Sequence, residues 1–251
     1  MYNAELNNKW IGHLKNFVAD KKVLLVGNSL SLFADKTGEL IDSYDVVIRV
    51  GKGLPYTEFK EFLGSKFDVW SFGVLRSGAI NQVTAPFKIY NFAQVHFYNK
   101  KDMLVTPAFM YNDKHQVYRD YFLIGSIRDL KGYLRFFPKD CDRISQGLIT
   151  LLFFIDKIKS YKDITLYGFD FFENHLSFNL SDGEKQSYSW HLPKTKTGAV
   201  MPHSNKLEKP FIERLASKNL INIIKCPTGP IDKYVMDSLF QKFRPEAVKK
   251  E

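Results

Sequence analysis

Short apolar runs that end next to glycine or other small residues recur along this chain, and they constrain its fold more than any other feature. Three such runs follow one another in the first third of the sequence, at 22–26, 45–51 and 66–73. Runs of this length without polar alternation are typical of parallel strands buried on both faces. We therefore expect an α/β protein with a mainly parallel central sheet flanked by helices, and with ligand groups gathered at the carboxyl edge of that sheet.

The rest of the chain continues this pattern, and 251 residues suffice for one domain with a full core, over 1–251. Residues 145–161 form the clearest amphipathic helix, with Ser145 as its N-cap. Residues 173–202 are long, polar and rich in turn residues, which is typical of a lid loop. Other helices are expected at 5–19 within an N-terminal region 1–20, at 125–137 and at 203–219; other strands are expected within 87–98, 103–111, 163–172 and 220–226, and a frayed tail at 244–251.

Charge and cysteine content indicate what kind of partner and which compartment to expect. The 36 Lys and Arg against 27 Asp and Glu give a formal charge of +9, which favours an anionic partner such as a nucleotide, an acidic glycan or a phospholipid surface. The basic residues are scattered, so we expect no nucleic-acid partner. With only Cys141 and Cys226, a disulfide framework is excluded and a reducing cytoplasm is favoured. The sequence shows no signal peptide and no stretch of about 18 apolar residues, so we expect a soluble or peripheral protein.

The residues after the first run form a candidate ligand loop. Gly27, Asn28 and Ser29 lack the further glycines of a dinucleotide motif and the Gly-Lys-Ser/Thr of a P-loop. On their own they are read most simply as a strand-to-loop turn. The segment RISQG, which begins at Arg143, is more specific, because an arginine and a helix start with small residues suit an anionic group. An ordinary N-cap beside a surface arginine is the alternative.

A few acidic and histidine residues carry the remaining chemistry. Asp170 ends a strand, where its carboxylate can accept hydrogen bonds from ribose hydroxyls or simply shape a turn. His203 lies five positions before Glu208 and can act as a general base, although lone histidines are more often structural. Asp140 and Asp142 form the D-x-D pattern by which many glycosyltransferases hold a metal-bound diphosphate, or they are two solvated turn residues.

Together and in order, these segments resemble the motifs of the sialyltransferases. VGNSLSLFADKTGELIDSYDVVIRVGKG with EFLGSKFDVW is similar to the family's long first motif, and RISQGLITLLFFIDKIKSYKDITLYGFDFF is similar to the second. SWH at 189–191 stands for the short third motif, and HSNKLE at 203–208 matches the fourth, a histidine followed by four residues and a glutamate. HSNK near FIERL is also similar to bacterial lipooligosaccharide sialyltransferases. The resemblance spans most of the chain, from 23 to 208.

This resemblance implies a single Rossmann-like domain of the glycosyltransferase A-type, a CMP-sugar donor, an inverting displacement at the anomeric carbon, and no metal or other cofactor. His203 would be the general base, because a neutral imidazole with a pKa of about 6.5 can take the acceptor hydroxyl's proton. His191 would assist the leaving phosphate. The donor nucleotide would be bound by Gly27, Asn28, Ser29, Arg143, Ser145, Gln146, Gly147, Gly168, Asp170 and Phe172.

The chain departs from the family pattern at two of these places. Gly51 stands where an asparagine is common, and Phe172 stands where bacterial members often have a phosphate-binding tyrosine. Other donors are then needed for the phosphate or the acceptor. The candidates for these contacts are Gly51, Lys52 and Tyr188, with Arg143 and His191 as further replacements.

Several aspects of the reaction stay open at the level of sequence. Sialic acid is the expected donor sugar, and Kdo, a related acidic keto sugar, is the main competitor. The acceptor is expected to be a lipid-linked glycan such as lipooligosaccharide, used in the cytoplasm or at the inner face of the membrane, because no Golgi-type stem precedes the motifs. Whether the protein forms a homo-oligomer is also open. A metal-dependent UDP-sugar transferase and a non-catalytic nucleotide- or glycan-binding protein are the rival classes.

Overall fold

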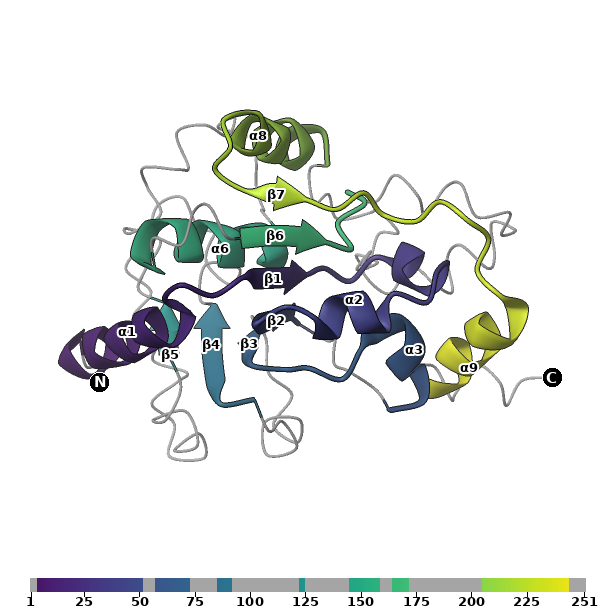
Figure 1. The fold of residues 1–251 in the computed structure, drawn as a ribbon, viewed down its shortest axis with the longest axis horizontal. Coiled ribbons are helices and arrows are strands. Elements are labelled where there is room, and N and C mark those ends of the chain that lie inside the picture. The colour runs from purple at the N-terminus through teal and green to yellow at the C-terminus, as the bar shows by residue number, and fades with distance from the viewer. Residues whose placement is uncertain are drawn as a thin grey trace, which may run out of the picture.

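Seven strands form one sheet in the part of the chain that the structure describes, and all neighbouring strands are parallel (Figure 1). Their order is β5-β4-β3-β2-β1-β6-β7. This confirms the expected α/β class with a mainly parallel central sheet. The computed structural model describes residues 4–51, 57–72, 85–91, 122–124, 145–158, 164–171 and 205–243.

The strands are short, and the central ones are buried on both faces. All residues of β1, β2 and β6 are buried, as the unbroken apolar runs predicted. Val23 of β1 lies opposite Val46 on one side and Ile164 on the other. The bounds are β1 Val23–Val26, β2 Val46–Val50, β3 Val69–Phe72, β4 Phe87–Asn91, β5 Phe122–Ile124, β6 Ile164–Tyr167 and β7 Asn222–Ile223.

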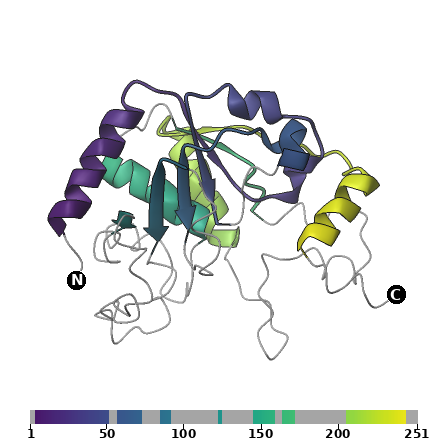
Figure 2. The same cartoon turned by 90° about the horizontal axis from the view of Figure 1, so that it is seen from below.

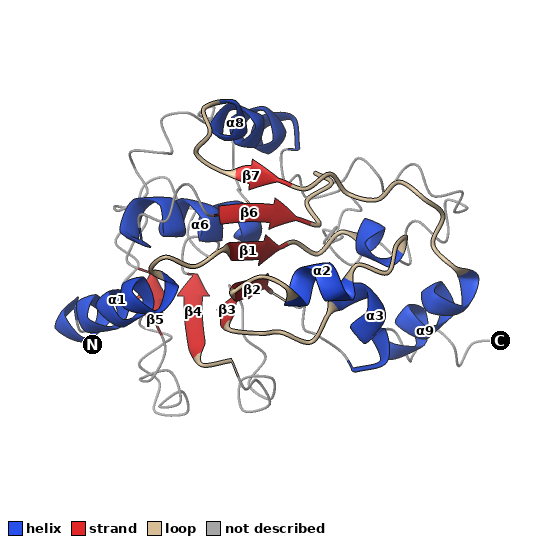
Figure 3. Ribbon diagram, in the orientation of Figure 1, coloured by secondary structure: helices blue, strands red, loops and turns tan. Residues whose placement is uncertain are grey.

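Helices cover both faces of the sheet (Figure 3), and α1 and α9 lie at opposite ends of the molecule (Figure 2). The helices expected at 5–19, 145–161 and 203–219 are present, whereas α9 and β5 lie where the sequence pattern predicted no such element. The helices are α1 Ala4–Val18, α2 Gly38–Asp42, α3 Lys60–Leu63, α6 Gln146–Phe153, α8 Asn205–Ser217 and α9 Lys233–Phe243; η1 Leu30–Phe33 and η2 Thr57–Phe59 are 3₁₀ turns, and η7 Phe154–Ile158 continues α6 as a π-helix.

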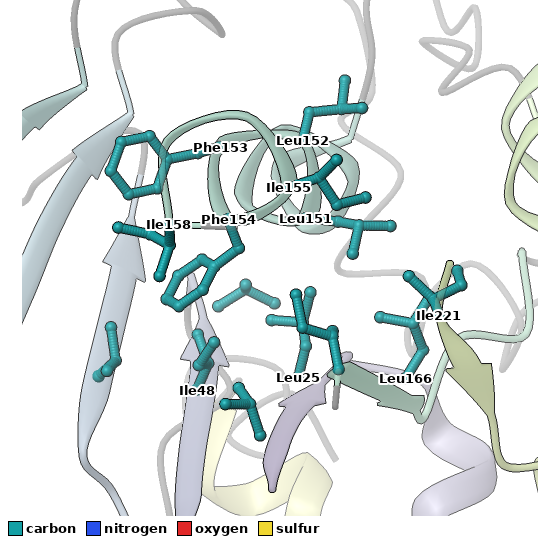
Figure 4. Close-up of a cluster of buried hydrophobic side chains, with 14 of the residues drawn as sticks. Leu25, Ile48, Leu151, Leu152, Phe153, Phe154, Ile155, Ile158, Leu166 and Ile221 are labelled. Carbon is teal, nitrogen blue, oxygen red and sulfur yellow. The ribbon is translucent and has the colours of Figure 1, made fainter. Parts of the chain in front are cut away.

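Alternate residues of the strands divide the core into two layers. Leu25 faces the layer that contains residues of α1, α6 and α8, and Leu24 faces the layer that contains residues of α2, α3 and α9. Figure 4 shows Leu151 of α6 and Ile155 of η7 above Leu25 and Leu166 of the sheet. Each fully buried aliphatic side chain contributes about 1.5–3 kcal/mol relative to its exposed state. Packing of this kind fixes where the first turn of α6 lies relative to the ends of the strands.

Candidate active site

The strand order creates a topological switch point between β1 and β6. Strands β2 to β5 lie on one side of β1, whereas β6 and β7 lie on the other. In parallel α/β sheets, ligands bind beyond the carboxyl ends of the strands at such a point. The two loops that leave the sheet there are joined, because the Gly27 N–H donates to the Tyr167 carbonyl at 2.7 Å and the Ser29 N–H donates to the Gly168 carbonyl at 3.1 Å. The predicted ligand loop therefore lies at the ligand position of this topology.

The ring of Phe169 joins the loop after β1 to the start of α6. A Cβ atom on Gly27 would lie 3.0 Å from this ring and 2.2 Å from the Gly168 carbonyl oxygen. A Cβ atom on Gly147 would lie 2.4 Å from the same ring. Neither position has room for a side chain, since real Cβ contacts do not occur at these distances. The two long motifs, more than a hundred residues apart in the sequence, thus meet at one aromatic ring.

Ser29 and Asp170, both predicted to contact the nucleotide, are hydrogen-bonded to each other. The Ser29 hydroxyl donates to Asp170 Oδ2 at 2.6 Å, accepts from the Ser31 N–H at 3.0 Å and lies 2.7 Å from the Ser31 hydroxyl. Cys226 also hydrogen-bonds Ser31, and burial raises the pKa of its thiol. This network fixes the loop after β1 against the loop after β6. Contact of Ser29 and Asp170 with a ligand stays a prediction.

The two polar side-chain atoms of Asn28 differ: one is hydrogen-bonded, and the other has no partner among the described residues. Its Nδ2 donates to the Val50 carbonyl at 3.0 Å, which joins the carboxyl ends of β1 and β2. Its Oδ1 is buried and has no hydrogen-bond partner among the described residues. Gly51 follows β2 beside it, and its N–H donates to the Ser71 carbonyl at 2.7 Å. Buried polar atoms are nearly always satisfied, so the free Oδ1 marks a place for a donor from a ligand.

The start of α6 carries the second unpartnered group. Ser145 is the N-cap, as predicted, and its hydroxyl accepts from the Leu148 N–H at 3.2 Å. Gln146 follows as the first helical residue, and its Nε2 is buried with no partner among the described residues. An α-helix also leaves its first N–H groups without intrahelical partners. These donors suit an anionic or hydroxyl-rich ligand.

Glu208 of α8 completes the cap of α6. Its Oε1 accepts from the Ser145 N–H at 2.5 Å and its Oε2 accepts from the Ser145 hydroxyl at 2.6 Å. Burial raises the pKa of Glu208 to about 7, against the opposing effect of these two hydrogen bonds. The sequence identified Glu208 only as the end of the fourth motif. Its contact with Ser145 joins residues 63 positions apart, and no local pattern predicts such a contact.

The second half of the first motif builds a corner of the fold. Arg49 is 1% exposed, and its guanidinium donates to the Lys66 carbonyl at 3.0 Å and the Leu63 carbonyl at 2.6 Å. Asp42 accepts from the Ser65 N–H, the Ser65 hydroxyl and the Lys66 N–H, each at 2.8 Å. These contacts hold the turn after α3 against β2. Ile41-Asp42, the strand that contains Arg49, and Gly64-Ser65-Lys66 all lie in the segments that resemble the first motif, and these contacts make them parts of one structural network.

The catalytic histidines predicted from the sequence lie outside the described residues, and so does the predicted lid at 173–202. Their assigned roles stay predictions. Within the described residues, no group of three or more His, Cys, Asp and Glu is arranged to hold a metal ion, and no helix is both long and apolar enough to cross a membrane. The predicted site residues and the D-x-D pair that fall outside are Lys52, Asp140, Asp142, Arg143, Phe172, Tyr188, His191 and His203.

Comparison with known proteins identifies the family. The model of glycosyltransferase family 29 (sialyltransferase) matches residues 21–220, which is most of the chain and includes both long motifs. A solved structure of a mammalian sialyltransferase in complex with Gal-β-1-3GalNAc-ortho-nitrophenol is similar at 17% identity and a TM-score of 0.46, over 89% of this chain and 79% of that one. No curated protein matches the chain. The chain is an enzyme and belongs to glycosyltransferase family 29, the sialyltransferases.

Proposed function

We propose that this enzyme transfers sialic acid from CMP-sialic acid to a hydroxyl of a lipid-linked cell-surface glycan such as lipooligosaccharide, with inversion at the anomeric carbon. Membership of the sialyltransferase family supports the donor class. The formal charge of +9 suits an anionic donor, an acidic acceptor and a membrane surface rich in anionic lipid. The site of action is the inner face of the membrane, where lipid-linked acceptors are available to a peripheral enzyme.

One observation carries the proposal: two buried atoms that have no hydrogen-bond partner among the described residues lie at the switch point, where the loops meet at the ring of Phe169. Asn28 Oδ1 can only accept a hydrogen bond, and Gln146 Nε2 can only donate one. Leaving a buried polar group unsatisfied costs about 1–3 kcal/mol. A nucleotide removes both costs, since its amino and hydroxyl groups donate while its phosphate and hydroxyl oxygens accept. The phosphate lies at the start of α6, where the helix favours negative charge.

The chemistry follows from the leaving group. A CMP-sugar releases CMP, a phosphate monoester. Hydrogen-bond donors can stabilise this leaving group, so no metal ion is needed to bind a diphosphate. Gln146 Nε2 and the first N–H groups of α6 supply such donors, and His191 assists the departing phosphate. His203 removes the proton of the acceptor hydroxyl as it attacks the anomeric carbon from the opposite face. The single domain over 1–251 and the lid at 173–202 belong to this proposal.

Calorimetry with CMP, CDP, UDP and GDP at equal concentration, with EDTA or manganese, tests the donor class. CMP should bind without metal, and at about 100 times its Kd it should stabilise the fold by about 2.7 kcal/mol. Gln146→Met removes the free amide while keeping the chain length, so CMP affinity should fall about tenfold, as expected for one hydrogen bond to a charged group. Asn16→Ala, at an exposed position of α1, should leave affinity unchanged.

Turnover with CMP-sialic acid and CMP-Kdo then identifies the donor sugar. His203→Ala should keep CMP affinity and lose roughly 10²–10⁴-fold in turnover, as expected for a general base. Binding of UDP with manganese in place of CMP would replace the proposal with a metal-dependent transferase. Binding of CMP without turnover of either donor, on a panel of lipid-linked acceptors, would favour a non-catalytic binding protein.

A further inference from the structure

Glu208 caps α6 from a different helix. In a capping box, a Glu three residues into a helix accepts from the N–H of the N-cap residue. Here Leu148 occupies that third position, and Glu208 of α8 accepts from the Ser145 N–H at 2.5 Å instead. The same carboxyl group also accepts from the Ser145 hydroxyl at 2.6 Å. The first turn of α6, where Gln146 Nε2 has no partner in the described part of the chain, therefore depends on the protonation state of a carboxyl on α8.

The hydrogen of the Ser145 hydroxyl has two different roles in the two protonation states. When Glu208 is ionised, this hydrogen is used by the carboxylate and cannot reach a ligand. When Glu208 is protonated, its O–H donates to Ser145 Oγ, which still accepts from the Leu148 N–H, since a hydroxyl oxygen has two lone pairs. The Ser145 hydrogen is then free to donate to a ligand oxygen. Protonation thus converts the N-cap into a ligand donor without breaking the cap.

The surroundings of Glu208 make the neutral form accessible. The side chain is 4% exposed, and burial raises its pKa to about 7, with the two Ser145 hydrogen bonds opposing that rise. Besides Glu208, the charged residues of α8 whose side chains the structure describes are the half-buried Lys209 and the exposed Glu213 and Arg214. At the start of α6, its hydrogen-bond partner Ser145 is neutral, and so is the next residue, Gln146. A phosphate bound at the start of α6 would add a negative charge beside the carboxyl, which favours its neutral form further.

We propose that Glu208 is a positioning residue that couples donor binding to proton uptake: as the anionic donor binds at the start of α6, the Glu208 carboxyl takes one proton from solvent, its O–H donates to Ser145 Oγ, and the Ser145 hydroxyl turns to donate to the donor. This inference rests on the proposed CMP-sugar site. By linkage, the affinity for the donor falls as pH rises above the range in which free Glu208 is protonated.

The methyl ester of CMP is the appropriate probe, because it is a phosphate diester and stays a monoanion near neutral pH. Calorimetry in buffers of different ionisation enthalpy measures the protons taken up on binding. The wild type should take up close to one proton per ligand at pH 8, and its affinity should fall by up to about tenfold per pH unit above about 7. Glu208→Gln, which mimics the neutral carboxyl, should bind with no such fall. Glu213→Gln, an exposed position of the same helix, should behave as the wild type does.

The outcomes separate this inference from the function on which it rests. A wild type that binds neither CMP nor its methyl ester at any pH removes the proposed donor. A wild type that binds with no proton uptake, or an uptake that Glu208→Gln leaves intact, overturns the role of Glu208. Should Glu208→Gln fail to fold by circular dichroism, Ser145→Ala decides. This variant lacks the hydroxyl that protonation of Glu208 frees for the ligand, so the fall in affinity with rising pH should be smaller than in the wild type, and an unchanged fall contradicts the inference.

Discussion

Arg49 and Glu208 are two buried ionisable side chains, and both lie in segments that resemble sialyltransferase motifs. Their surroundings differ. Arg49 is 1% exposed, donates to two backbone carbonyls and has the carboxylates of Asp42 and Asp68 nearby. Glu208 is 4% exposed and bonded to Ser145, a neutral partner. One charge is compensated by opposite charge, while the other is held by dipoles alone.

The difference decides which group can change state near neutral pH. Burial lowers the pKa of Arg49 to about 10, with the two carboxylates opposing, so the guanidinium stays charged. Burial raises the pKa of Glu208 to about 7, so its carboxyl gains or loses a proton in the physiological range. A compensated buried charge fixes architecture, whereas a poorly compensated one can take part in function. The Arg49 region belongs to the first kind and the Glu208 region to the second.

Replacing Arg49 is the strongest test of this contrast. Arg49→Met keeps much of the buried stem but leaves the Leu63 and Lys66 carbonyls without their donor and Asp42 without a nearby positive charge. Removing one partner from a buried charged network destabilises by about 3–5 kcal/mol. Urea unfolding measures the change. Arg214→Met, at an exposed position of α8, should cost well under about 1 kcal/mol, and a similar small cost for Arg49→Met would remove the distinction between the two regions.

The pH dependence of the free energy of unfolding tests Glu208, and its expected effect is the second largest. The folded carboxyl has a pKa of about 7 against 4.5 for the ordinary group, so between these values the folded state binds the proton more tightly than the unfolded state. The stability that this group contributes therefore falls as pH rises through that window, by on the order of 2 kcal/mol from pH 5 to pH 8. Above the window it levels off.

Urea unfolding of the wild type and Glu208→Gln across that range isolates the contribution, because the amide does not titrate. The variant should gain in stability relative to the wild type as pH rises. Glu213→Gln serves as the matched control on the same helix and should follow the wild type. A constant difference between Glu208→Gln and the wild type at all pH values would show that Glu208 does not titrate in this window.

Asp42 gives the smallest expected effect. Burial pushes its pKa upward, but hydrogen bonds from the Lys66 and Ser65 N–H groups and from the Ser65 hydroxyl outweigh it, and the net pKa is lowered. Asp42→Asn should cost about 1 kcal/mol at neutral pH, since an amide replaces one acceptor oxygen with a donor. The wild type's advantage should disappear as pH falls through the lowered pKa, whereas Asp237→Asn, exposed on α9, should cost well under about 1 kcal/mol at neutral pH.

The sequence predicted those parts of the fold that local patterns encode. The apolar runs gave β1, β2 and β3 within a few residues, and the Ser145 N-cap marked the start of α6 correctly. The pattern did not predict β5, a three-residue strand at the sheet edge, or α9. β5 lies at the edge of the sheet, and α9 packs Val235 and Met236 onto one layer of the core, so packing onto a neighbouring surface can outweigh weak local preference at both.

For the candidate site, sequence alone determined the identity of the loops and their order in the chain: a Gly-Asn-Ser turn after one strand, a Ser-Gln-Gly helix start, and a glutamate near the end of the last motif. Only the tertiary structure decided which of these groups form hydrogen bonds within the protein. Ser29 and Asp170 bind each other and Arg49 holds a turn, whereas Asn28 Oδ1 and Gln146 Nε2 are left without a partner among the described residues. The physical reason is that a hydrogen bond between distant residues, such as that of Glu208 to Ser145, depends on how the helices pack against the sheet, and this packing is a property of the whole core.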